Sequence, residues 1–152
     1  MNEITIEPAD AQEIGPLLAL FERQHREHHI IRSQEELHAV LVALRRQPDE
    51  GFVLSANCQG SPVGVAYAAR ILSLEHGGWS GWLEEFYVLP EWRGQGVGSR
   101  LLAAVLAGAT GRGWAALDLE VDIGHRRAIP LYQRYRFEGV NRTRLVRRLA
   151  RE

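Results

Sequence analysis

Residues 83–113 read LEEFYVLPEWRGQGVGSRLLAAVLAGATGRG, and this stretch of the chain decides the fold. Residues 82–88 have the aromatic and β-branched content of a strand, which Pro90 closes. A glycine cluster at residues 93–98 follows. It runs directly into a segment whose apolar residues recur on one helical face: Leu101, Leu102, Val105, Leu106 and Ala109. The stretch therefore predicts a strand, a glycine-rich turn and a helix in direct succession.

The rest of the chain alternates between helical and strand patterns. Apolar residues at helical spacing predict helices that begin at Ile14 and Ser33, and Ser33 with Glu36 has the spacing of a capping box. Strands are predicted at residues 4–6, 52–57, 63–71, 115–122, 137–140 and 143–149, and a further helix at residues 126–136. The predicted order is β-α-α-β-β-β-α-β-α-β-β, which indicates a single mixed α/β domain over residues 1–152.

The overall composition is that of an ordinary globular protein, with 45% apolar residues, 24% charged residues and a net charge of −1. We therefore expect neither a nucleic acid nor a membrane as partner. Cys58 is the single cysteine, so an internal disulfide is excluded, and no signal peptide or membrane span is apparent. A cytoplasmic location is expected. All 18 basic residues are arginines, and a basic cluster near the end of the chain predicts either a solvated edge strand or a surface for an anionic partner: Arg142, Arg144, Arg147, Arg148 and Arg151.

The glycine-rich turn has the properties of an anion site. The first amides of a helix have no partner within the helix, and the helix dipole adds partial positive charge there. Gly94, Gly96 and Gly98 allow a phosphate to approach the backbone and allow positive φ, and Ser99 could add a hydroxyl. The P-loop pattern is excluded because the chain contains no lysine, and the dinucleotide fingerprint fails after Gly98.

What remains is the pattern Arg93-x-x-Gly96-x-Gly98. It resembles the Q/R-x-x-G-x-G/A signature of the GNAT superfamily of N-acetyltransferases, which in that family surrounds the pyrophosphate of coenzyme A. The resemblance continues through Leu119-Glu120-Val121 and then through four further residues in register with the family pattern, Ala128, Leu131, Tyr132 and Phe137. It covers the C-terminal half closely, from Leu83 to Phe137, and the N-terminal half only in the order of elements.

Three residues depart from the family pattern. His125 stands where asparagine is usual, and Arg136 replaces the usual glycine before Phe137. Pro130 lies inside the predicted helix, where we expect a tolerated bend.

The resemblance implies a mixed, mostly antiparallel sheet that is splayed at its middle, with helices on both faces. It also implies acetyl-CoA as acetyl donor. The main chain of three residues would contact acetyl-CoA: Phe86, Tyr87 and Val88. The pyrophosphate of acetyl-CoA would lie at the turn residues Arg93, Gly94, Gln95, Gly96, Val97, Gly98 and Ser99. His125 would also contact acetyl-CoA. Tyr132 falls in register with the general acid of the family. A tyrosine hydroxyl with a pKa near 10 stays protonated and suits protonation of a departing thiolate, whose pKa is about 8.5.

The general base is left open between two glutamates. Glu84 resembles the base of polyamine acetyltransferases, and Glu120 resembles that of ribosomal-protein N-terminal acetyltransferases. Strand alternation places Glu84 and Glu85 on opposite faces unless a bulge intervenes, so at most one of them faces the site. Asp118, Glu120 and Asp122 share one strand face, which should open to water or to a cleft.

The sequence therefore predicts transfer of an acetyl group to a primary amine of a small molecule or a peptide, by direct attack in a ternary complex. The alternative is a non-catalytic acyl-CoA-binding module of the same fold. The histidines lack metal-ligand spacing, so no metal is expected. A homodimer is a candidate assembly.

Overall fold

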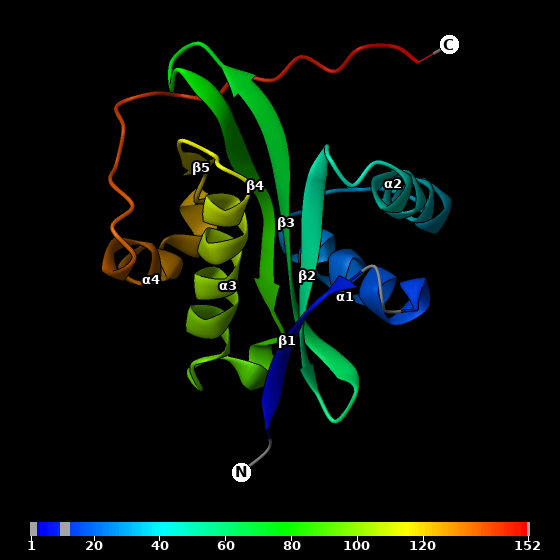
Figure 1. Cartoon of the computed structure of the whole chain (residues 1–152). Helices are drawn as coiled ribbons and strands as arrows, with labels where there is room; N and C mark the ends of the chain where they lie inside the picture. The colour runs from blue at the N-terminus through cyan, green and yellow to red at the C-terminus, as the bar shows by residue number, and fades with distance from the viewer. Residues whose placement is uncertain (1–2, 10–12, 152) are drawn as a thin grey trace.

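The computed structural model describes residues 3–9 and 13–151. Its centre is a five-stranded sheet in the order β1-β2-β3-β4-β5. The strands are β1 (Ile4–Pro8), β2 (Gly51–Cys58), β3 (Ser61–Ser73), β4 (Gly78–Val88) and β5 (Leu117–Leu119). The helices are α1 (Ile14–Glu27), α2 (Gln34–Arg46), α3 (Val97–Gly111) and α4 (Ile129–Arg134), with 3-10 helices η2 (Pro90–Trp92) and η3 (Ile123–Ala128). Figure 1 shows α3 and α4 on one side of the sheet and α1 and α2 on the other.

The sheet is antiparallel from β1 to β4 and ends in one parallel pair. β4 pairs with β5 only from Gly81 to Leu83, although β4 continues to Val88. The second half of β4 is therefore not paired with β5. This confirms the mixed, splayed sheet that the family resemblance implied.

A bulge interrupts β4 at Glu84. Tyr67 of β3 pairs with Glu85, and the next residue, Ala68, pairs with Leu83, so that Glu84 is an extra residue without a partner across the ladder. A bulge of this kind bends the strand and redirects side chains. The simple alternation expected for residues 83–88 is broken at this position.

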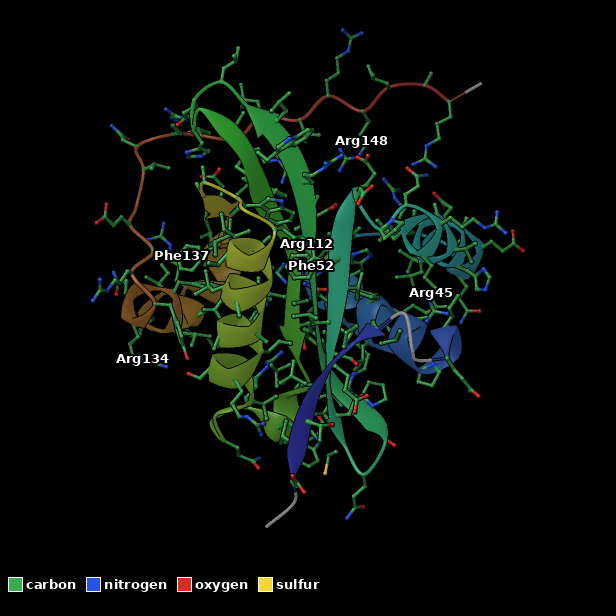
Figure 2. The ribbon with its side chains drawn as sticks, viewed as in Figure 1. Arg45, Phe52, Arg112, Arg134, Phe137 and Arg148 are labelled. Atoms are coloured by element: carbon green, nitrogen blue, oxygen red, sulfur yellow. The ribbon has the colours of Figure 1, made fainter. Side chains whose placement is uncertain are left out.

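Apolar side chains pack against both faces of the sheet. Buried residues on the α3 side include Phe52, Ala66, Leu101, Leu102 and Val105, and those on the α1 side include Leu17, Leu20, Phe21, Val65 and Tyr87. The guanidinium of Arg112 lies 4.1 Å from the centre of the Phe52 ring at the edge of the first cluster (Figure 2). The two clusters fix the sheet between the helix layers and so fix the strand ends that form the site.

Several predicted boundaries are confirmed, including the capping box of α2, in which Ser33 and Glu36 cap each other. The predicted helix at residues 126–136 is wrong at its start, because the chain is 3-10 helical to Ala128 and α4 begins at Ile129. Pro130 consequently lies in the first turn of α4, where its missing N–H needs no partner, and no interior bend results.

The predicted pair of closing strands is also wrong. Residues 137–151 form no strand, and Figure 1 shows them as an extended segment that rises from α4 and crosses above β3 and β4. The predicted strand at residues 115–122 is reduced to Leu117–Leu119. Within the described ranges, the longest helix has 15 residues, and none is long and apolar enough to cross a membrane.

Candidate active site

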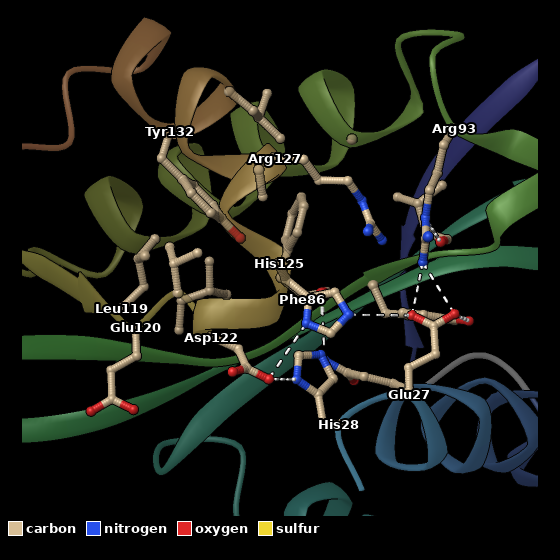
Figure 3. A pocket seen from close by; sticks show the side chains of 18 of the residues that line it. Glu27, His28, Phe86, Arg93, Leu119, Glu120, Asp122, His125, Arg127 and Tyr132 are labelled. Carbon is tan, nitrogen blue, oxygen red and sulfur yellow. Dashed lines mark hydrogen bonds and ion pairs between the residues drawn. The ribbon is translucent and has the colours of Figure 1, made fainter. Parts of the chain in front are cut away.

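A cavity of about 350 Å³ lies where α1, the second half of β4, the end of β5 and α4 meet (Figure 3). Most of the residues predicted for the site line it: Glu84, Phe86, Tyr87, Val88, Arg93, Gly94, Gly98, Glu120, His125 and Tyr132. Four predicted residues of the turn do not line it: Gln95, Gly96, Val97 and Ser99. The structure therefore brings both candidate bases, the candidate acid and the edge of the glycine turn to one cavity.

The glycine turn has the conformation that the sequence predicts. Gly94 and Gly96 have φ values of 71° and 83°, in the left-handed region that glycine adopts without strain. A Cβ at either position would meet no heavy atom within 4 Å, so the space beside both glycines is open. Gly96 is the N-cap of α3 and no side chain caps this end, which leaves the first amides of the helix available to an anion.

Other turn residues serve the local structure. The side chain of Val97 is buried in the core, so only its backbone amide could reach a ligand. Gln95 donates a hydrogen bond to the carbonyl oxygen of Glu91 at 3.1 Å. The carbonyl oxygen of Ser99 accepts a hydrogen bond from the Tyr135 hydroxyl at 2.9 Å, which ties α4 to the start of α3.

Arg93 connects the turn to two other elements. Its Nε donates to the carbonyl oxygen of Val88 at 2.9 Å, and its Nη2 contacts Glu27 of α1 at 3.1 Å (Figure 3). The Tyr87 hydroxyl donates to the same carboxylate at 2.9 Å. Desolvation of Glu27 raises its pKa, but the hydrogen bonds from Tyr87 and Arg93 outweigh this effect and the net pKa is lowered. Sequence reasoning missed Glu27, because its partners are more than 50 residues away along the chain.

Tyr132 of α4 is buried between two aromatic rings. The centre of its ring lies 6.0 Å from that of Phe86 and 5.7 Å from that of Phe137, both in edge-to-face geometry. Figure 3 shows its hydroxyl pointing into the cavity. Burial raises the pKa of Tyr132 to about 12, so the hydroxyl stays protonated throughout the physiological range.

The two candidate bases have different surroundings. At the bulge, Glu84 lines the cavity, and desolvation together with repulsion from Glu85 raises its pKa. Glu85 is not among the lining residues and lies 2.9 Å from His25 Nε2. Glu120 is ion-paired with Arg144 at 2.8 Å on an exposed surface. A raised pKa makes a carboxylate a better proton acceptor. The surroundings of the two glutamates therefore favour Glu84 over Glu120 as the base.

Two histidines and an aspartate form a cluster at the side of the cavity nearest α1. Asp122 Oδ2 lies 3.1 Å from His28 Nδ1 and 3.4 Å from His125 Nδ1, and His125 Nε2 lies 4.0 Å from Glu27 (Figure 3). A hydrogen bond with His28 is the largest effect that lowers the pKa of Asp122. The three groups offer ligand atoms within 4.8 Å of one another and are the set that could hold a metal ion among the described residues. The expectation that the protein uses no metal stays a prediction.

The fold and the site together define a class, namely acetyltransferases with a splayed sheet and a glycine turn at the start of a helix. A family model described as the acetyltransferase (GNAT) family matches residues 16–137. The chain belongs to this family.

The chain is similar to thialysine N-epsilon-acetyltransferases. It is 38% identical to the enzyme of Bos taurus over 87 residues. The matched segment covers 53% of this chain and 49% of the bovine protein. It is also 38% identical over 58 residues to that of Sus scrofa, covering 36% of this chain and 34% of the porcine protein. The similarity therefore spans half or less of the length of these curated relatives.

Solved structures share the whole fold. An integron cassette protein from the metagenome of Cole Harbour Salt Marsh matches with a TM-score of 0.84 at 26% identity, over 97% of this chain and 91% of that one. An aminoglycoside N-acetyltransferase in complex with CoA matches with a TM-score of 0.84 over 99% of this chain and 97% of that one. Its identity of 20% supports a likeness in fold alone.

Proposed function

We propose that this protein transfers the acetyl group of acetyl-CoA to a primary amine in a ternary complex. One observation carries the proposal. A protonated hydroxyl, Tyr132, and a carboxylate of raised pKa, Glu84, line the same cavity. General acid and general base are the two proton-transfer roles that acetyl transfer from a thioester to an amine requires.

The residues around the glycine turn fit coenzyme A. The start of α3 has no side-chain cap and the space beside Gly94 and Gly96 is open, as a pyrophosphate requires. The part of β4 beyond Leu83 is not paired with β5, which leaves backbone groups near Phe86 for an amide-containing arm and for the acetyl carbonyl. When bound, acetyl-CoA supplies the acetyl thioester and a thiol leaving group.

Each side chain then has a defined task. Glu84 accepts the proton that the ammonium of the acceptor must lose before its nitrogen attacks the acetyl carbon. Backbone amides of the second half of β4 donate hydrogen bonds to the developing oxyanion, an effect typically worth about 10²–10³ in turnover. As the carbon–sulfur bond breaks, Tyr132 donates its proton to the sulfur. Glu27 holds Arg93 and Tyr87 in place beside the turn.

We further propose that the acceptor is a small cationic amine. Glu84 lines the cavity and has no ion-pair partner among the described residues, so its carboxylate attracts positive charge to this end of the cavity. Three nearby carboxylates, Glu85, Asp118 and Glu120, already contact His25, His76 and Arg144. The name of one similar protein, an acetyltransferase of thialysine, agrees with an amine of this kind. We place the reaction in the cytoplasm, as expected from the lone cysteine.

A coenzyme-release assay tests this function. The protein is mixed with acetyl-CoA and a panel of lysine analogues, polyamines and aminoglycosides, and free thiol is measured over time. We expect amine-dependent thiol release, with a mass increase of one acetyl group on the acceptor. Calorimetric binding of acetyl-CoA without release for any amine would instead support the non-catalytic acyl-CoA-binding module.

A further inference from the structure

The cluster of His28, Asp122 and His125 joins two segments that are far apart along the chain. His28 is the C-cap of α1, and its backbone amide donates to the carbonyl oxygen of Gln24 at 3.1 Å. Asp122 is the N-cap of η3, and its side chain accepts a hydrogen bond from the amide of Gly124 at 3.4 Å. His125 follows within η3. Because His28 and Asp122 are 94 residues apart, no spacing in the sequence indicated this cluster.

The distances between the three side chains match the ligand spacing of a zinc ion. Figure 3 shows the Nδ1 atoms of both histidines directed at the carboxylate of Asp122, 3.1 Å and 3.4 Å from its Oδ2 atom. One ligand atom from each of the three residues lies within 4.8 Å of the others. A tetrahedral zinc ion with bonds of about 2.1 Å holds its ligand atoms about 3.4 Å apart. Small side-chain rotations would therefore let all three residues bind one ion.

One of these ligand atoms lacks a partner. Nδ1 of His125 is buried and forms no hydrogen bond with any described residue, because its contact with Asp122 is not aligned as one. A buried polar atom without a hydrogen bond is a place where a water molecule or an ion can bind. The Nε2 atom of the same ring lies 4.0 Å from the carboxylate of Glu27. A carboxylate at this position favours the proton on Nε2, which leaves the lone pair of Nδ1 free for a metal ion.

The charges of the cluster also favour a divalent cation. Asp122 has no arginine partner among the described residues, and its ion-pair contacts are with the two histidines. With both imidazoles neutral, its negative charge has no counterion. Two nitrogen ligands and one oxygen ligand suit zinc, whereas magnesium and calcium bind oxygen ligands. Zinc is thus the ion that both the charge and the donor atoms indicate.

We propose that His28, Asp122 and His125 bind one zinc ion, which links the end of α1 to the segment between β5 and α4. Three protein ligands leave a fourth position for a water molecule. All three residues line the cavity, so the link joins two of its walls. None of them transfers a proton in the proposed acetyl transfer. The ion therefore stabilises the walls of the cavity and takes no part in the chemistry.

Calorimetry on the full chain without an affinity tag, freed of metal by a chelator, tests the site. The wild type should bind one zinc ion per chain and should not bind magnesium. His28→Ala should weaken zinc binding at least about 100-fold, because one of three ligands is lost. Asp122→Asn keeps an oxygen that can accept the hydrogen bond within η3, so it should fold normally, and it should also weaken zinc binding.

The matched control is His76→Ala. His76 contacts Asp118 at 2.8 Å, and the side-chain exposures of this pair are 25% and 46%, compared with 26% and 46% for His28 and Asp122. No second imidazole completes a ligand set around His76 among the described residues, so His76→Ala should bind zinc as tightly as the wild type. Absence of zinc binding by the wild type would overturn the proposal. Equal affinities of the wild type and His28→Ala would also overturn it.

Thermal unfolding and hydrogen exchange test the link between the two segments. Zinc at about 100 times its dissociation constant should raise the Tm of the wild type by about 5–10 °C and leave that of His28→Ala unchanged. Amide hydrogens of residues 122–128 and of the last turn of α1 should exchange more slowly when zinc is bound. Slower exchange in only one of these segments would refute the link. Both readouts are independent of whether the proposed acetyl transfer occurs.

Discussion

Replacement of Tyr132 by phenylalanine separates the proposed chemistry from the packing around it. The phenylalanine ring keeps the edge-to-face contacts with Phe86 and Phe137. Among the described residues, no side chain or backbone group forms a hydrogen bond with the Tyr132 hydroxyl, so its loss leaves no buried partner unsatisfied. We therefore expect the free energy of unfolding to change by less than about 1 kcal/mol.

The kinetic effect should be far larger. A positioned proton donor contributes about 10²–10⁴ in rate, which corresponds to about 2.7–5.4 kcal/mol of activation free energy. Because Tyr132 has a pKa of about 12, it remains a proton donor at every pH below this value. The wild type should accordingly show no loss of turnover from this group between pH 6 and 10.

The assay is thiol release at saturating acetyl-CoA, with thermal unfolding measured in parallel. As a control, Tyr67→Phe removes the hydroxyl of a half-buried tyrosine of β3 that does not line the cavity, and its turnover should stay within about tenfold of the wild type. Near-normal turnover of Tyr132→Phe would refute the acid role and would mean that the thiolate departs without protonation.

Four further outcomes are expected. Because the pKa of Glu84 is raised, kcat/KM should rise with pH through a limb above the ordinary carboxyl range. Glu84→Gln should abolish this limb and lower turnover about 10²–10⁴-fold, and a normal limb in this variant would contradict the assignment. Glu120→Gln should mainly raise KM for a cationic acceptor. Gly96→Glu should weaken acetyl-CoA binding about 100-fold in calorimetry, because it places a carboxylate at the uncapped start of α3. The control, Gly60→Glu, changes a glycine that has nearly the same φ in a distant turn, and this variant should bind acetyl-CoA normally. Equal affinities of the two variants would refute the pyrophosphate site. Arg136 has a φ of 65°, so Arg136→Gly should stabilise the fold by about 0.5–1 kcal/mol in urea unfolding, and an unchanged midpoint would show that this backbone position is not strained. Treatment with a chelator should leave turnover unchanged, and a loss that zinc restores would show that a metal ion takes part.

The glycine turn was predictable because its conformation depends on local residues. Positive φ at Gly94 and Gly96 follows from the missing side chain and from the helix that begins immediately afterwards. Tyr132 was predictable for a different reason, since its place in the family pattern fixed which residue of α4 faces the cavity. These parts of the site depend on short stretches of sequence.

Features that depend on distant segments were not predictable. The bulge at Glu84 arises from the register between β3 and β4, which no local pattern encodes. Glu27 reaches Arg93 only because α1 packs across the sheet, and its own neighbours in the sequence indicate nothing beyond a polar end of the helix. The prediction of strands at residues 137–140 and 143–149 failed for the opposite reason. These residues do have strand character, but a strand also needs an edge with which to pair, and the sequence does not show which edge is accessible.

The short parallel pairing of β5 has a consequence for local stability. β5 pairs with β4 over Leu117–Leu119, and two backbone hydrogen bonds involving Ala115 and Ala116 precede this pairing, whereas β3 pairs with β4 from Gly64 to Ser73. Amide hydrogens of β5 and α4 should therefore exchange with deuterated water much faster than those of β2 and β3, because opening them breaks few hydrogen bonds. A ligand that spans the gap between β4 and β5 should slow this exchange on both sides. The segment that carries Tyr132 would then be ordered most firmly when the cavity is filled.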